Sequence, residues 1–184
     1  MSLEKAKELL GDMFSFNADF LFEVVQQLKI PKSYKILDIG TGFGTMAITL
    51  ALQGYKVLTG EPEGHNWSNW RDAAEKVGVE KNIIFQHFRA EDLPFEDDSF
   101  DAVFCYTSFH HIDDKHNAMK EFKRVIHNKG IIVMFEFNQE GIVIVRRRMP
   151  THPDLVDPRD YVKDLHFSSR IIESQHINAY LFKK

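Results

Sequence analysis

The sequence has a single cysteine, Cys105, and no apolar run of the roughly 18 residues that a membrane-spanning helix needs. One thiol excludes an intramolecular disulfide and any zinc cluster built on cysteines. Charged residues interrupt the first dozen positions, so the N-terminus does not resemble a signal peptide. These absences predict a cytoplasmic protein that does not insert into a membrane.

The sequence also lacks a large excess of positive or negative charge. The formal net charge of the 184 residues is −4 at pH 7, which disfavours a broad nucleic-acid-binding surface. With 43% hydrophobic and 27% charged residues, the composition is that of one globular domain, 1–184. Its expected parts are N-terminal helices (1–33), a cofactor-binding core (34–137) and a C-terminal part (138–184) with a substrate-side loop, a helix and strands. Monomer and homodimer both stay open.

What the sequence does have is a strand, a glycine-rich turn and a helix in direct succession over residues 35–47. The turn holds three alternate glycines: Gly40, Gly42 and Gly44. They allow a sharp bend and let a ligand approach the amides at the start of the next helix. Asp38 places a carboxylate just before the turn, where it can accept a hydrogen bond from an ammonium group. Because Thr45 stands where a dinucleotide fingerprint has glycine, the fit to a nicotinamide cofactor is incomplete.

Hydrophobic periodicity predicts strands that alternate with helices through most of the chain. Strands are expected at 35–39, 56–60, 82–88, 100–106, 131–137, 170–175 and 178–183. Helices are expected at 3–10, from an N-cap at Asn17, at 46–52, at 64–77, from Asp113 to a closing Gly130, and from Asp157 to about Leu165. The pattern loosens over 138–153. The fold class is therefore α/β: a single doubly wound, Rossmann-like, mostly parallel seven-stranded sheet with helices on both faces and the last strand antiparallel.

Glu61 stands at the end of the second expected strand, 17 residues beyond Gly44. An acid at this place is positioned to bridge a ribose diol. The alternative is an acid that only stabilises the start of the helix expected at 64–77. The loop 89–93 follows the third strand, and we expect it at the same edge, where open α/β sheets bind ligands.

These motifs resemble the class I S-adenosylmethionine-dependent methyltransferases, especially the small-molecule group that includes the ubiquinone/menaquinone-type C-methyltransferases. The matching segments come in the family order across 34–137: they are 36–44, 60–61, 90–95, 99–101 and 110–112. The resemblance implies that the cofactor is S-adenosyl-L-methionine, or S-adenosyl-L-homocysteine as product.

The resemblance also implies a role for each matching residue. The methionine part of the cofactor would be held by Asp38, Gly40, Thr41, Gly42 and Gly44. Glu61, with Pro62 after it, would bind the ribose. Ala90 and Glu91 would lie along the adenine, and Tyr106 would border the sulfonium and the acceptor. The family often has aspartate where this sequence has Arg89, so Glu91 or a main-chain carbonyl is expected to accept from the adenine amino group instead.

The catalytic candidates are His111 and Tyr106. A base is needed only if the acceptor carries a proton that must leave, and His110 or His111 is suited to that role. The alternative is that the two histidines pack and cap the following helix. No His pair has a convincing metal-ligand spacing, so no metal is expected. The arginine run 146–148 is either a solvated face or a rim that binds an anionic acceptor.

The leading hypothesis is methyl transfer from S-adenosylmethionine to a small-molecule acceptor. The alternatives are a module that binds the cofactor without catalysis, a methyltransferase acting on RNA or protein, and, last, a nicotinamide oxidoreductase. The sequence does not identify the acceptor or the atom that is methylated.

Overall fold

The computed structural model describes residues 1–65 and 68–184. The chain divides into two compact units, Met1–Phe88 and Arg89–Lys184. The expectation of one domain stays a prediction. Within the described ranges, no helix combines the length and the apolar character that a membrane crossing requires.

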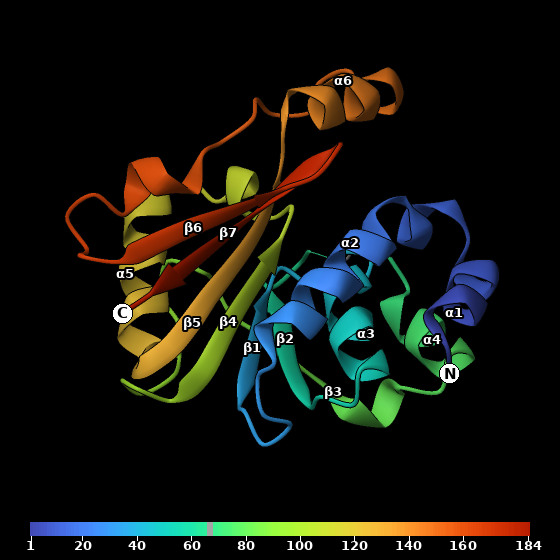
Figure 1. The fold of residues 1–184 in the computed structure, drawn as a ribbon, viewed down its shortest axis with the longest axis horizontal. Helices are drawn as coiled ribbons and strands as arrows, with labels where there is room; N and C mark the ends of the chain where they lie inside the picture. The colour runs from blue at the N-terminus through green and yellow to red at the C-terminus, as the bar shows by residue number, and fades with distance from the viewer. Residues whose placement is uncertain (66–67) are drawn as a thin grey trace. The chain divides into compact units, whose positions relative to one another are not determined.

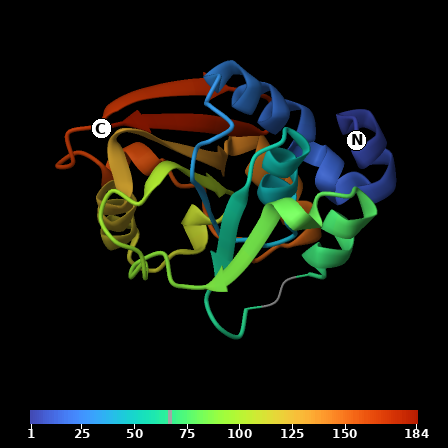
Figure 2. The ribbon, with the colours of Figure 1, turned by 90° about the horizontal axis from the view of Figure 1, so that it is seen from below.

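The described residues of the first unit form three strands, four α-helices and the 3-10 turn η1 (Glu80–Asn82), and Figure 1 and Figure 2 show their course. In chain order the strands and α-helices are α1 (Leu3–Leu10), α2 (Asp12–Leu28), β1 (Ile36–Ile39), α3 (Thr45–Leu52), β2 (Val57–Glu61), α4 (Trp70–Lys76) and β3 (Ile83–His87). β2 lies between β1 and β3 and is parallel to both. α3 packs against β2, and α2 packs against α3. All four residues of β1 are buried, so the glycine turn begins from a fixed strand.

Gly60 in β2 is required by the close approach of β3. A Cβ atom at this position would lie 2.0 Å from the carbonyl oxygen of Gln86 and 2.4 Å from the ring of Phe88. We expect Gly60→Ala to lower the free energy of unfolding by about 3 kcal/mol or more, because backbone must move to admit the methyl group. Urea denaturation measures this loss. Gly78→Ala is the comparison: nothing lies within 4 Å of a Cβ there, and its φ of 72° costs alanine only about 1 to 2 kcal/mol. An equal effect of both changes would contradict the expectation.

The second unit contains four strands; α5 lies beside them, and α6 lies beyond the end of β5 (Figure 1). In chain order its main elements are β4 (Phe100–Tyr106), η2 (Phe109–His111), α5 (Lys115–Val125), β5 (Ile126–Phe137), α6 (Gln139–Arg148), η3 (Pro158–Tyr161), β6 (Ser168–Glu173) and β7 (Ile177–Lys183). β4 and β5 are parallel, and β7 is antiparallel to both β5 and β6. The seven strands follow the order β3-β2-β1-β4-β5-β7-β6. This confirms a mostly parallel, seven-stranded sheet whose last strand is antiparallel.

Two predicted helix boundaries are wrong for identifiable reasons. α2 begins at Asp12 rather than at Asn17, which is buried inside the helix. Gly11, with φ of 73°, ends α1 and starts α2 at once. α5 ends at Val125, and Gly130 lies within β5 instead of closing the helix. The pairing of β4 with β5 shifts register near Gly130, where a Cβ would stand 3.0 Å from backbone oxygens.

Other helix predictions are revised in extent. The described part of the helix expected at 64–77 begins only at Trp70, and Trp67 lies outside the described residues. α5 starts after Asp114, whose side chain accepts from the amide of Asn117, and not after Asp113. The helix expected from Asp157 is the single 3-10 turn η3. The loosely patterned segment after residue 137 forms α6, which Asn138 caps by accepting from the amide of Gly141.

Candidate functional site

The glycine turn in the first unit has the conformation that its sequence predicts. Gly40, Gly42 and Gly44 have φ angles of 81°, 50° and 76°, all in the left-handed region that glycine adopts most easily. The amide of Gly44 donates to the carbonyl of Thr41 at 2.7 Å, which closes the turn. Around a Cβ at Gly42, the nearest atom would be the Gly40 oxygen, 4.0 Å away. The turn therefore leaves open space beside its backbone.

Asp38 is a buried carboxylate with one oxygen unused. Its side chain accepts from the Thr59 hydroxyl at 2.8 Å, and the Thr41 hydroxyl lies 2.9 Å from that of Thr59. Because the Thr59 hydrogen goes to Asp38, Thr41 donates to Thr59. Asp38 is 1% exposed, and its Oδ1 has no hydrogen-bond partner. Burial, together with the charge of Glu61, raises the pKa of Asp38 to about 7, although the hydrogen bond from Thr59 acts in the opposite direction and lowers it.

An unsatisfied carboxylate oxygen in the interior costs free energy until it meets a donor. A cationic donor offsets more of this cost than a neutral donor does, because it also stabilises the ionised form of the acid. The geometry around Asp38 therefore suits a ligand with an ammonium group, as the sequence predicts.

Glu61 reaches the glycine turn from the end of β2. Its Oε1 accepts from the amide of Gly42 at 2.9 Å. The side chain is buried, and this burial raises the pKa of Glu61. A carboxylate accepts hydrogen bonds on both oxygens, so Oε2 is suited to a ribose hydroxyl while Oε1 holds the turn. Pro62 follows directly, and its carbonyl accepts from the amide of His65 at 3.2 Å.

The loop expected along the adenine lies at the start of the second unit. Ala90 is buried, whereas Arg89 is exposed. The Arg89 guanidinium lies 3.3 Å from a Glu91 carboxylate oxygen, and the Glu91 carbonyl accepts from Asn117 of α5 at 2.5 Å. Arg89 therefore pairs with Glu91, the acid that was one of the two candidates to accept from the adenine amino group. A main-chain carbonyl is then the better acceptor for an adenine amino group.

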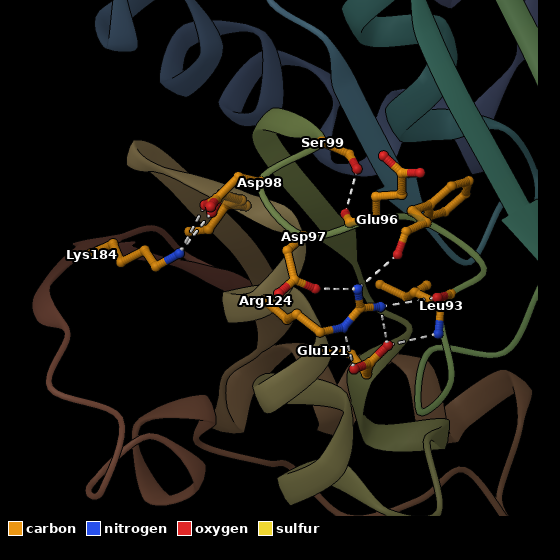
Figure 3. A network of polar contacts seen from close by, with 10 residues as sticks. Leu93, Glu96, Asp97, Asp98, Ser99, Glu121, Arg124 and Lys184 are labelled. Carbon is orange, nitrogen blue, oxygen red and sulfur yellow. Dashed lines mark hydrogen bonds and ion pairs between the residues drawn. The ribbon is translucent and has the colours of Figure 1, made fainter.

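Arg124 of α5 anchors the continuation of this loop, and Figure 3 shows its contacts. The guanidinium donates to the carbonyls of Leu93 and Phe95 at 3.0 and 2.7 Å. It also pairs with Glu121 at 2.6 Å and with Asp97 at 2.9 Å. Glu121 in turn accepts from the Leu93 amide at 2.9 Å, and Arg124 lowers the pKa of Glu121. One planar fork thus joins α5 to both ends of the segment 93–97.

We expect Arg124→Lys to loosen this segment, because an ammonium group does not match the fork geometry that serves two carbonyls and two acids. The free energy of unfolding should fall by about 1 to 3 kcal/mol. Urea denaturation measures the change, with Lys120→Ala on the exposed side of α5 as control. Equal stability of Arg124→Lys and the wild type would show that the contacts of Arg124 do not stabilise the segment 93–97.

Tyr106 ends β4, with its ring edge-on to Phe135 at a centroid distance of 6.4 Å. The next residue, Thr107, has φ of 47°, which is strained for a β-branched residue. Its amide donates to the Phe135 carbonyl at 2.8 Å. The bend turns the chain from β4 into η2, which carries His110 and His111.

The two histidines of η2 have different surroundings. His110 is buried, and its Nδ1 lies 2.6 Å from Oε2 of Glu136 in β5. Oε1 of Glu136 accepts from the Phe109 amide at 2.9 Å. Partial burial, together with the neighbouring His110 and His152, lowers the pKa of His111 to about 4. His111 is therefore neutral at pH 7 but a weak base, and its catalytic role stays a prediction.

His152 completes a group that sequence reasoning missed. Its ring centroid lies 4.7 Å from that of His110 and 5.6 Å from that of His111. The residue follows α6, about forty positions after His111, so no local spacing predicts the contact. Glu136, an acid within an apolar strand, was the one signal in the sequence. Because buried carboxylates are almost always paired, it indicates that a cationic or hydrogen-bonding partner lies nearby.

A cavity of about 250 Å³ lies within the first unit beside the glycine turn. Helices α1, α2 and α4 contribute to its walls, and Phe43 of the turn faces it. The apolar lining includes Leu9, Leu10, Met13, Phe14, Phe43 and Trp70. Met13 and Phe43 are about half exposed, so the cavity is accessible from solvent.

The chain is similar to known methyltransferases in sequence and in structure. Residues 37–134 match the family described as methyltransferase domain. A demethylmenaquinone methyltransferase of Staphylococcus aureus is 29% identical over 163 residues, which are 85% of this chain and 66% of that protein. A 27-O-demethylrifamycin SV methyltransferase of Amycolatopsis mediterranei is 31% identical over 104 residues, 56% of this chain and 38% of that protein. The chain thus spans less than two thirds of these relatives.

The crystal structure of a SAM-dependent methyltransferase from Aquifex aeolicus aligns with a TM-score of 0.70 at 17% identity, covering 99% of this chain and 98% of that one. At this identity the likeness shows the fold, which is the Rossmann-like fold of class I methyltransferases. Because the family model matches more than half of the sequence, the chain belongs to the methyltransferase domain family. The resemblance drawn from the sequence motifs is confirmed.

Proposed function

We propose that this chain catalyses methyl transfer from S-adenosylmethionine to a small-molecule acceptor in the cytoplasm. The observation that carries the proposal is the buried Asp38, whose Oδ1 lacks a partner beside an open glycine turn. An amino-acid ammonium group supplies the missing donor. A pyrophosphate would be repelled by the same carboxylate, which separates this cofactor from a dinucleotide.

The residues around Asp38 fit the rest of the cofactor. The left-handed glycines leave space for the methionine part to approach the backbone. Glu61, which already holds the Gly42 amide, accepts from the ribose through its other oxygen. For the second unit, the roles of Ala90 and Glu91 along the adenine stay predictions.

When bound, S-adenosylmethionine supplies a methyl group that its sulfonium has already activated. The protein's contribution is therefore mainly orientation, which is worth up to roughly 7 to 11 kcal/mol in well-aligned reactions. A base is needed only for an acceptor that loses a proton. Since the pKa of His111 is lowered to about 4, the low basicity of its imidazole favours an acceptor whose attacking atom is already deprotonated.

The acceptor is proposed to be a compact molecule with both apolar and polar parts. The relatives described above are named for demethylmenaquinone and demethylrifamycin SV. The cavity of about 250 Å³ beside Phe43 is lined by apolar side chains and also by polar and charged ones, such as Asn69 and Lys76. Its volume suits a single ring system rather than a macromolecular segment.

The test has two stages. Calorimetric titration with S-adenosylmethionine and with S-adenosylhomocysteine should give saturable binding of one ligand per chain. Cofactor labelled in the methyl group should then transfer label to the small-molecule fraction of a cell extract. Absence of binding to both compounds would refute the proposal. Label found only in the macromolecular fraction would show instead that the acceptor is RNA or protein.

One observation favours a second candidate, a module that binds the cofactor without catalysis. The Arg89 and Glu91 pair occupies the acid that was expected to contact the adenine. Binding without transfer to any fraction of the extract would support it. A macromolecular methyltransferase has less support, because Arg146 of the arginine run already pairs with Asp154 at 2.6 Å. Whether the chain is a monomer or a homodimer stays a prediction.

A further inference from the structure

Three histidines in the second unit bring their ring nitrogens together. His110 and His111 come from η2, and His152 comes from the segment after α6. One nitrogen from each ring lies within 4.8 Å of the other two. Of the described residues, this is the one group of three or more histidine, cysteine or acidic side chains with metal-binding spacing.

The hydrogen bonds of His110 determine which of its nitrogens is available. Nδ1 lies 2.6 Å from the Glu136 carboxylate, an acceptor, so Nδ1 carries the proton and donates. Nε2 is then the unprotonated nitrogen, with a lone pair. It is buried and has no hydrogen-bond partner, and the residue is 6% exposed. A histidine held by a carboxylate on one nitrogen and open on the other is the usual arrangement of a metal ligand.

His152 has the same arrangement. Its Nδ1 lies 3.1 Å from the carbonyl oxygen of Pro153, which can only accept, so Nδ1 donates and Nε2 keeps a lone pair. Its own carbonyl accepts from the Arg146 guanidinium at 2.9 and 3.1 Å. The segment is thus held against α6, and its buried imidazole is directed to the other two rings.

We propose that His110, His111 and His152 form a binding site for a zinc-like divalent transition-metal ion, with Glu136 orienting His110. Three neutral imidazoles suit zinc, copper or nickel rather than magnesium or calcium, which prefer oxygen ligands. Three nitrogens around one tetrahedral zinc ion are about 3.4 Å apart. The nitrogens have to move closer by up to about 1.4 Å, and the exposed ring of His111 is the one most able to move.

Three protein ligands leave the fourth tetrahedral position open. Sites of this composition generally hold water or a substrate oxygen there, whereas structural zinc sites are closed by four protein ligands. Two of its three ligands, His110 and His111, lie shortly after Tyr106, the last residue of β4. The simplest rival is a histidine and glutamate pair with a purely structural role, in which buried water meets Nε2 of His110.

The experiment uses the purified full chain with any affinity tag removed. Co²⁺ is the spectroscopic ion, because its visible absorption reports tetrahedral nitrogen coordination, and Zn²⁺ is then titrated as a competitor. We expect one ion per chain. His111→Ala and His152→Ala should each weaken binding at least about 100-fold, while His127→Ala, at an exposed position of β5, should leave it unchanged.

Glu136→Gln separates a ligand-orienting role from mere packing. Glutamine keeps the size of the side chain but not its charge, and loss of such a partner typically weakens metal affinity 10- to 100-fold. Circular dichroism confirms that each variant is folded, and the exposed His111 gives a variant with the least risk to folding. The inference is refuted if the wild type binds no Co²⁺, or if His152→Ala and His127→Ala bind it equally. Neither result depends on the proposed methyl transfer.

Discussion

The Asp38→Asn protein is expected to be more stable than the wild type at pH 8 when no ligand is bound. Burial raises the pKa of Asp38 to about 7, far above the ordinary value of an aspartate in an unfolded chain. The folded state therefore binds a proton that the unfolded state releases over this range. The free energy of unfolding falls as the pH rises from about 4 to about 7, by roughly 4 kcal/mol in all.

Asparagine removes this pH dependence but introduces an amide. Its oxygen can still accept from Thr59, while its NH₂ group lies where Oδ1 had no partner. An unsatisfied buried amide costs about 1 to 3 kcal/mol, so the net gain at pH 8 is about 1 to 3 kcal/mol. Near pH 4 the wild type pays no ionisation cost, so the variant should be the less stable protein by about 1 to 3 kcal/mol.

Urea denaturation at pH 5 and pH 8 measures this difference. Asp164→Asn, at an exposed position, is the control and should change stability at neither pH. An Asp38→Asn protein less stable than the wild type at pH 8 would contradict the account. It would mean that the carboxylate is stabilised by a partner within the ligand-free protein.

Gly42→Ala should weaken cofactor binding at the glycine turn much more than it weakens the fold. The variant keeps the amide that donates to Glu61, and its methyl group meets no protein atom closer than 4.0 Å. The left-handed φ of 50° costs about 1 to 2 kcal/mol for alanine. The methyl group also fills the space through which a ligand approaches the turn. We therefore expect affinity for S-adenosylmethionine to fall at least about 100-fold with only a small loss of stability.

Gly78→Ala is the matched control for this variant. Gly78 has φ of 72° and open space around a Cβ, so alanine there carries the same backbone strain outside the turn. Thermal unfolding should show similar losses for both proteins, and calorimetric titration should show weakened binding only for Gly42→Ala. Affinities within threefold of each other would place the ligand away from the turn.

The sequence predicts best where the interactions are local. Gly40 to Gly44 require left-handed φ whatever the rest of the chain does, and β1 and α3 follow from continuous apolar runs on either side. The last strand is antiparallel because only a tight turn separates it from β6. Asp38 and Glu61 could be placed beside the turn because parallel strands end at one edge.

Prediction fails where tertiary contacts outweigh local signals. Asn17 has the character of an N-cap, but the positive φ of Gly11 begins the helix earlier. Gly130 has the character of a helix terminator, but it serves a register shift in β5 that only the pairing with β4 reveals. His152 belongs with His110 through contacts that no sequence spacing encodes.

We propose that Asp38 receives the ammonium group of S-adenosylmethionine. The most direct measurement compares the affinity for this cofactor with that for methylthioadenosine, which lacks the amino-acid part, in the wild type and in Asp38→Asn. A charged partner that loses its counterpart typically forfeits 2 to 5 kcal/mol. The wild type should therefore prefer the cofactor by roughly 100-fold or more, and the variant should bind both compounds about equally. An undiminished preference in Asp38→Asn would contradict the account.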